Sequence, residues 1–145
     1  MPIFVDTNVL VYARDAREPA KQERAAAWME HLWSTGIGRL SVQVLAEFYV
    51  TVTRKLDPGM EPAVARADVE DLLAWGPVPL DGDLLLTARS LEERFRLSFW
   101  DALIVAAART ARCEALLTED LHHGATYDGV RILDPFRTPV GSLEP

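Results

Sequence analysis

Four acidic residues each lie inside or directly beside an apolar or helical segment: Asp6, Glu47, Asp101 and Asp120. The first and last follow short strand-like runs, and the two between them lie in helical stretches. If the side chains converge, two carboxylates about 4 Å apart repel each other by roughly 4 kcal/mol at an effective dielectric constant near 20. Such a pocket needs a proton or a metal ion, so we expect a divalent cation as cofactor.

Each of these acids also has a purely structural interpretation. Aspartate is a common helix N-cap, which would account for Asp6 and Asp120. Ser98 and Asp101 have the spacing of a capping box in which aspartate replaces the usual glutamate. Glu47 would by default face solvent. No single acid decides between the two interpretations, and their joint placement is the informative feature.

The elements that must position these acids alternate along the chain. Short apolar runs predict strands, and longer runs with helical periodicity predict helices. Because strands alternate with helices, we expect an α/β fold, a three-layer α/β/α sandwich with a short, mostly parallel central sheet. The expected strands are 3–5, 37–40, 115–118 and 130–133, with 77–80 able to pair only as an edge strand because of its prolines, and the expected helices are 19–33, 42–56, 62–75, 83–95 and 100–111.

In parallel sheets of this kind ligands bind at the carboxyl ends of the strands. Asp6 and Asp120 both follow expected strands and would lie at that edge. The helix at 100–111 is apolar almost all round, which is typical of a helix packed between a sheet and its neighbours. We expect a single domain over residues 1–145, with an irregular tail from about Asp134 that contains Pro135, Pro139 and Pro145.

Composition restricts the class of protein. A chain of 145 residues is long enough to bury about 68–70% of its unfolded surface without disulfides. The single cysteine, Cys113, suits a reducing compartment, so we expect a cytoplasmic protein. The longest uninterrupted apolar stretch, Ala102 to Ala108, is far below membrane-spanning length, and we expect no membrane role.

The formal net charge of −7 argues against indiscriminate binding along duplex nucleic acid, which depends on many contacts from lysine and arginine to phosphate. It does not exclude a nucleic-acid enzyme, because bound cations offset an acidic site. Two local basic clusters are interpreted as solvated helix faces: Arg14, Arg17, Lys21 and Arg24, and Arg89, Arg94 and Arg96.

The segments that carry the four acids are also familiar as a set. They are 4–10 (FVDTNVL), 45–49 (LAEFY), 98–104 (SFWDALI) and 117–121 (LTEDL). Together they resemble the PIN-domain ribonucleases, particularly the VapC toxins of bacterial toxin–antitoxin pairs. In that family the acids gather at one end of a parallel sheet and bind Mg²⁺ or Mn²⁺ for hydrolysis of RNA.

The resemblance implies a role for each acid. Asp6 and Asp101 would be the principal direct metal ligands. Glu47 and Asp120 would act as water-mediated ligands or as activators of the attacking water, which the cation makes more acidic. The groups expected to hold these carboxylates are Thr7, Asn8 and Thr118, and Glu119 is a candidate for the further acid found in some members. One ion and two ions both remain open.

The resemblance also implies partners: an RNA substrate, a cognate antitoxin whose tail covers the site, and a second copy of the chain in a homodimer. The adjacent histidines His122 and His123 are better explained by a polar loop than by metal binding, because neighbouring side chains rarely converge on one ion. Trp28 and Trp33 are interpreted as packing or interface residues.

Two other functions stay open. A phosphatase of the haloacid-dehalogenase type would use Asp6 as nucleophile, but it needs a second aspartate two residues on, where this chain has Asn8. A partner-binding module without nuclease activity would use the acids as helix caps and its apolar grooves for recognition.

Overall fold

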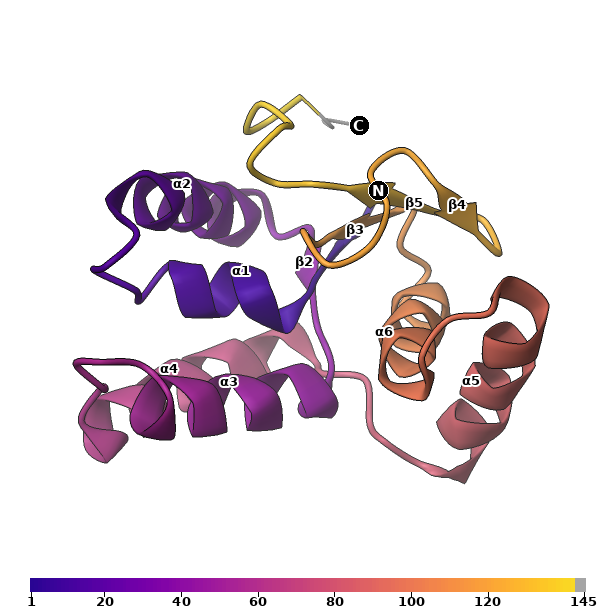
Figure 1. The fold of residues 1–145 in the computed structure, drawn as a ribbon, viewed down its shortest axis with the longest axis horizontal. Helices are drawn as coiled ribbons and strands as arrows, with labels where there is room; N and C mark the ends of the chain where they lie inside the picture. Colours follow the sequence, from indigo (N-terminus) through magenta and orange to yellow (C-terminus); the bar gives the residue numbers. More distant parts are fainter. Residues whose placement is uncertain (143–145) are drawn as a thin grey trace.

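A five-stranded sheet lies at the centre of the computed structural model, which describes residues 1–142 (Figure 1). The sheet has the order β2-β1-β3-β5-β4; the first four of these strands are parallel, and β4 is antiparallel to β5. The strands are β1 (Ile3–Val5), β2 (Gly38–Arg39), β3 (Ala115–Leu117), β4 (Thr126–Tyr127) and β5 (Val130–Leu133). All residues of β1 and β3 are buried, as the uninterrupted apolar runs of central parallel strands require.

Helices cover both faces of the sheet, which confirms the predicted three-layer arrangement. Figure 1 shows α1 and α2 on one side and α5 and α6 on the other, with α3 and α4 forming a pair beyond α1. The helices are α1 (Thr7–Tyr12), α2 (Pro19–Thr35), α3 (Val42–Arg54), α4 (Pro62–Leu72) with a 3₁₀ turn at Leu73–Trp75, α5 (Gly82–Phe95) and α6 (Phe99–Thr110).

The helix starts follow from local sequence. The side chains of Ser41, Asp81 and Ser98 each accept a hydrogen bond from a backbone N–H in the first turn of α3, α5 and α6, where the helix itself offers no partner. Proline opens α2 and α4. In α6 every residue from Ala102 to Ala108 is buried, so the expected central helix is present against β3, β5 and α5.

Helix α1 and strand β4 were not predicted from the sequence, and the edge strand expected at 77–80 is only partly present. Helix α1 and strand β4 are too short to show a periodicity. In the segment 77–80, only Val78 pairs with its neighbour, through one isolated parallel bridge to Ser41. Its N–H donates to the carbonyl of Leu40 at 3.0 Å, while the flanking prolines have no N–H to extend the ladder.

The first basic cluster is more than a solvated face, which corrects the sequence interpretation. Arg14 forms a bidentate ion pair with Asp68 of α4, at 2.7 Å for its Nε. Lys21 pairs with Glu119 at 2.8 Å. The guanidinium of Arg24 donates to the carbonyl of Thr138 at 2.9 Å. These side chains therefore join α1 and α2 to distant parts of the chain, because each finds a fixed acceptor there.

The segment after β5 is irregular but held in place. The indole N–H of Trp28, a residue with no exposed surface, donates to the carbonyl of Pro135 at 3.0 Å. Trp28 is thus a packing residue. The imidazole Nδ1 of His123 accepts from the N–H of Asp134 at 3.0 Å. Pro145 lies outside the described residues. Within residues 1–142, no helix has both the length and the hydropathy to cross a bilayer.

Candidate functional site

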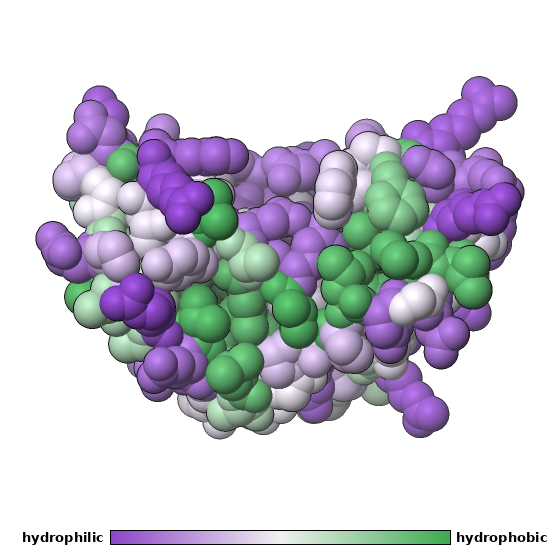
Figure 2. Space-filling model, turned by 90° about the horizontal axis from the view of Figure 1, so that it is seen from below, coloured by the Kyte–Doolittle hydropathy of each residue, from purple (hydrophilic) through white to green (hydrophobic). Residues whose placement is uncertain are grey.

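The carboxyl ends of β1 and β3 meet at one edge of the sheet. Val5 lies opposite Leu117 in the parallel register, so Asp6 and Thr118 leave neighbouring strands at the same level. Figure 2 looks onto this edge from below and shows hydrophilic side chains in a recess between two apolar regions. The start of α6 supplies Asp101, and α3 supplies Glu47.

Asp6 is the buried centre of the recess, with 6% of its surface exposed. Its Oδ1 accepts from the backbone N–H of Thr7 at 2.7 Å, which makes Asp6 the N-cap of α1. Its Oδ2 accepts from the hydroxyl of Thr118 at 2.8 Å. The capping interpretation is therefore correct for one oxygen, while the other is held by the neighbouring strand end.

Asn8 and Thr118 connect Asp6 to Asp120. The amide nitrogen of Asn8 donates to the hydroxyl oxygen of Thr118 at 3.0 Å and to Oδ2 of Asp120 at 3.1 Å. The hydroxyl oxygen of Thr118 also accepts from the N–H of Asp120 at 3.1 Å. Thr118, which has no exposed surface, thus has all its hydrogen-bonding capacity in use and fixes the geometry of both aspartates.

Glu47 reaches the same recess from α3. Its Oε2 accepts from the hydroxyl of Thr7 at 3.1 Å, and its Oε1 accepts from the side-chain amide of Gln43 at 2.7 Å. Sequence reasoning missed Gln43, although its position four residues before Glu47 places the two side chains on one helix face. The side-chain oxygen of Gln43 is buried and accepts no hydrogen bond within residues 1–142.

Burial and neighbouring charges both shift the pKa of Asp6. Burial raises the pKa of Asp6 from 3.8 to about 7; the hydrogen bonds from Thr118 and Thr7 oppose the shift, and the charges of Asp120 and Glu47 add to it. A carboxyl with this pKa exchanges its proton near neutrality, so a cation can displace the proton at low cost.

The pKa of Asp120 is also raised. Partial burial raises the pKa of Asp120, donation by Asn8 opposes the shift, and the charges of Glu119, Asp101 and Glu47 raise the pKa further. Asp101 is therefore near enough to act electrostatically on Asp120. Its own N–H is capped by Ser98 at 3.1 Å, as the sequence predicted.

Glu119 is engaged away from the other acids. Its two oxygens accept from the hydroxyl of Tyr12 at 2.6 Å and from the ammonium of Lys21 at 2.8 Å. Lys21 also lies over the rings of Tyr12 and Phe136, at 4.6 and 5.1 Å from the ring centres. Sequence reasoning missed Tyr12 and Lys21 as partners of this acid, because nothing in the spacing links α1 and α2 to residue 119.

The donor set suits a hard divalent cation, because it consists of carboxylate, hydroxyl and amide oxygens. Within the described residues, no three acidic, histidine or cysteine side chains lie close enough together to enclose an ion directly. The carboxylates of Asp6, Glu47 and Asp120 each accept from a different side-chain donor. Mg²⁺ usually takes only one or two carboxylates directly and keeps several waters, so the arrangement still fits such an ion.

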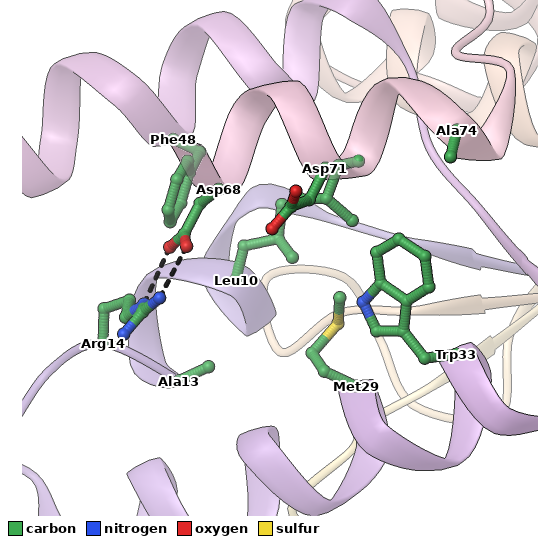
Figure 3. A pocket seen from close by; sticks show the side chains of 10 residues that line it. Leu10, Ala13, Arg14, Met29, Trp33, Phe48, Asp68, Asp71 and Ala74 are labelled. Carbon is green, nitrogen blue, oxygen red and sulfur yellow. Dashed lines mark hydrogen bonds and ion pairs between the residues drawn. The ribbon is translucent and has the colours of Figure 1, made fainter. Parts of the chain in front are cut away.

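A second hollow lies on the other side of α1. Figure 3 shows this cavity, of about 590 Å³, between α1, α2 and the α3–α4 pair, with the Arg14–Asp68 ion pair on its rim. Its apolar lining includes Leu10, Met29 and Trp33. Trp33 is 43% exposed and touches Trp75, with ring centres 5.2 Å apart.

The raised pKa of Asp6 predicts a pH dependence of stability. In metal-free buffer the folded protein keeps the Asp6 proton up to about pH 7, whereas the unfolded chain releases it near 3.8. The resulting stabilisation is complete below the lower value and is lost as the pH rises through the higher one, a difference of roughly 4 kcal/mol. Asp6→Asn should flatten this dependence, as thermal unfolding between about pH 4 and pH 8 would show. Equal slopes for both proteins would contradict the assignment.

The hydroxyl of Thr118 predicts a second effect. Thr118→Val preserves the shape but removes the donor to Asp6 and the acceptor for Asp120 and Asn8. Above about pH 7, where Asp6 is charged, we expect a loss of about 1.5–3 kcal/mol in urea unfolding, because a buried charged group loses its partner. The pKa of Asp6 should rise further. Thr118→Ser is the control, since it keeps the hydroxyl; if the serine variant were the less stable of the two, the hydrogen-bonding explanation would be wrong.

The fold is found in known proteins. A toxin–antitoxin complex from Klebsiella pneumoniae has a TM-score of 0.62 and 20% identity, covering 93% of this chain and 98% of that chain. The sarcin–ricin loop cleaving toxin VapC20 of Mycobacterium tuberculosis has a TM-score of 0.56 and 20% identity, covering 81% of this chain and 89% of that chain. VapBC2 from Rickettsia felis, bound to a promoter DNA fragment, has a TM-score of 0.59 and 15% identity, covering 91% of this chain and 97% of that chain. No curated protein sequence matches this chain.

The PIN domain family matches residues 3–128, a span that includes all four predicted acids and every element from β1 to β4. The resemblance noted in the sequence is thereby confirmed at the level of the family, whose nucleases generally use divalent metal ions. The chain belongs to the PIN domain family.

Proposed function

We propose that this protein is a Mg²⁺- or Mn²⁺-dependent endoribonuclease that acts as the toxin of a toxin–antitoxin pair. The observation that supports this most directly is the convergence of Asp6, Glu47 and Asp120 through Thr7, Asn8 and Thr118, with Asp101 in electrostatic range. Membership of the PIN domain family supports nuclease chemistry. RNA as substrate is supported by the fold shared with VapC20, whose description is a sarcin–ricin loop cleaving toxin.

The proposed site uses Asp6 and Asp101 as the principal metal ligands, with Glu47 and Asp120 acting through water. A bound divalent cation would acidify a water molecule and offset negative charge on the phosphate. Thr118 and Thr7 keep donors on the Asp6 oxygens and so favour its charged form. Glu47 keeps Thr7 and Gln43 as fixed donors, which leaves its carboxylate oriented toward the recess.

The test is cleavage of structured RNA by the purified protein with Mn²⁺ or Mg²⁺. Asp6→Asn and Asp101→Asn should each reduce the rate about 100-fold or more, equivalent to about 2.7 kcal/mol in the barrier. Glu47→Gln should lose rate with little change in unfolding, because Glu47 is exposed. Chelation of the metal should have the same effect as the aspartate variants.

The matched control is Glu23→Gln, which neutralises an exposed acid of α2 and should leave the rate unchanged. Undiminished cleavage by the Asp6 and Asp101 variants would remove the catalytic assignment. A covalent phosphoenzyme trapped on Asp6 would instead revive the phosphatase alternative, for which the structure supplies no supporting feature.

A partner-binding role is compatible with this activity and is favoured by the cavity of Figure 3. We propose that a cognate antitoxin covers the acidic recess and inserts apolar side chains between α1, α2 and α4. The cavity offers the apolar surfaces of Leu10, Met29 and Trp33, and a positively charged segment would complement the acids. Of the structures with this fold, the one from Klebsiella pneumoniae is described as a toxin–antitoxin complex, and the one from Rickettsia felis as VapBC2 bound to DNA.

This partner is tested by co-expression with whatever small protein an adjacent open reading frame encodes. Met29→Glu places a charge in the apolar cavity, so co-purification should be lost while the isolated variant still cleaves RNA. Leu80→Glu, at a residue 45% exposed and outside that cavity, is the control and should keep the partner. Retention of the partner by the Met29 variant would contradict the groove assignment.

We further propose a homodimer and a cytoplasmic location for the same protein. Self-association is supported by exposed apolar side chains that a monomer would leave in water, among them Val42, Leu73, Leu85 and Leu86. Val42 and Leu73 border a groove of about 580 Å³ between α3 and α4. The cytoplasmic location is supported by the free thiol of Cys113, which suits a reducing compartment, and it is where cellular RNA would be available as substrate.

A further inference from the structure

An exposed tryptophan stands next to the acidic recess. Trp100 lies in the first turn of α6, directly before Asp101, and 63% of its surface is exposed. Its neighbour Phe99 packs against the core, and the two rings meet edge to face with centres 6.2 Å apart. Trp100 is therefore not a core residue, and its position makes a flat aromatic surface available beside the site.

Trp100 borders a groove whose remaining lining comes from α3 and its C-cap residue, Lys55. The groove has a volume of about 510 Å³ and is lined by Ala46, Glu47, Val50, Thr51, Lys55 and Trp100. Glu47, Thr51 and Lys55 are four residues apart and form one stripe along the helix. The groove thus begins at a proposed catalytic acid and runs roughly 12 Å along α3 to a lysine, at 1.5 Å per residue.

Lys55 is the cation of this groove. The chain has two lysines, Lys21 and Lys55. Lys21 is paired with Glu119, whereas Lys55 is exposed and makes no ion pair within residues 1–142. The chain has a net charge of −7, and Lys55 lies about two helical turns from Glu47 of the acidic recess. Its ammonium group can therefore bind a phosphate of a substrate that extends away from the recess along α3.

An aromatic face and a cation along one groove match a nucleotide, because every base has a face that stacks on aromatic rings and every linkage carries a phosphate. A paired base does not expose its face, so the occupant must be unpaired. A second copy of this chain is the alternative occupant, and the sedimentation experiment below tests it.

We propose that the Trp100–Lys55 groove binds an unpaired nucleotide of the RNA substrate, with its base on the indole of Trp100 and its phosphate at Lys55. The proposal rests on the ribonuclease function proposed above and adds a contact that the acids do not supply: a stacking surface for one base and a cation for its phosphate, next to the cleaved bond. Trp100 is then a specificity-determining residue, and Glu47 marks the end of the groove at which cleavage takes place.

The first experiment measures binding and cleavage of a short single-stranded RNA and of the same sequence in a duplex. Trp100→Ala should weaken binding of the single strand roughly 5- to 150-fold, while Trp100→Phe retains most of the affinity because it keeps a stacking face. The loss should appear in KM for cleavage more than in kcat. Duplex binding should not change. Leu80→Ala, at an exposed apolar residue outside this groove, is the control.

The second experiment uses salt. Lys55→Gln should reduce the slope of log Kd against log salt by about 0.7, the contribution of one phosphate contact in a single strand. Arg131→Gln, which neutralises an exposed cation of β5, should leave the slope unchanged. A merely structural role for Lys55 would lower affinity without changing this slope.

The outcomes separate this proposal from the function on which it rests. If the wild-type protein cleaves RNA and Trp100→Ala has unchanged affinity and KM, the nucleotide groove is wrong and the ribonuclease assignment stands. If Trp100→Ala instead converts a dimer to a monomer in sedimentation without changing affinity for the single strand, the groove belongs to a protein interface. If the wild-type protein cleaves no RNA but binds the single strand through Trp100 and Lys55, the binding groove survives and the nuclease function fails.

Discussion

The parallel register between β1 and β3 is the constraint on which the rest of the structure depends. It sets Val5 opposite Leu117, and so brings the first residues beyond the two strands, Asp6 and Thr118, within hydrogen-bonding distance. A shift by one residue would reverse the side-chain directions of a strand that is buried on both faces and would separate this pair. The packing of the two apolar strands thereby keeps the Asp6 carboxylate buried, although burial of a charged group is unfavourable.

The acidic recess shows how one residue can have two roles. Asp6 uses one oxygen to cap α1 and the other to accept from Thr118, and both donors oppose the effect of burial on its pKa. From the sequence alone, Asp6 fits both an N-cap and a metal ligand. The two roles are compatible, because an N-cap occupies only one of the two carboxylate oxygens.

The sequence predicted the layered fold because strong apolar runs alternate with long amphipathic helices, as in β1 and α3. It also predicted which acids lie at the sheet edge, since Asp6 and Asp120 each follow a buried strand. It did not predict α1 or β4, whose six and two residues are too short to show a period. Nor did it predict the attachment of Glu119 to Lys21 and Tyr12, because a contact between residues about 100 positions apart leaves no trace in local spacing.

The segment beyond β5 limits how far the chain can be shortened. Its irregular backbone suggests a dispensable end, but the carbonyls of Pro135 and Thr138 accept from Trp28 and Arg24 of α2. A truncation at Leu133 would leave a fully buried indole N–H without an acceptor, at a cost of about 1–3 kcal/mol. A trimmed version for crystallisation or fusion therefore has to extend past Thr138, since these two carbonyls fasten α2 to the segment after β5.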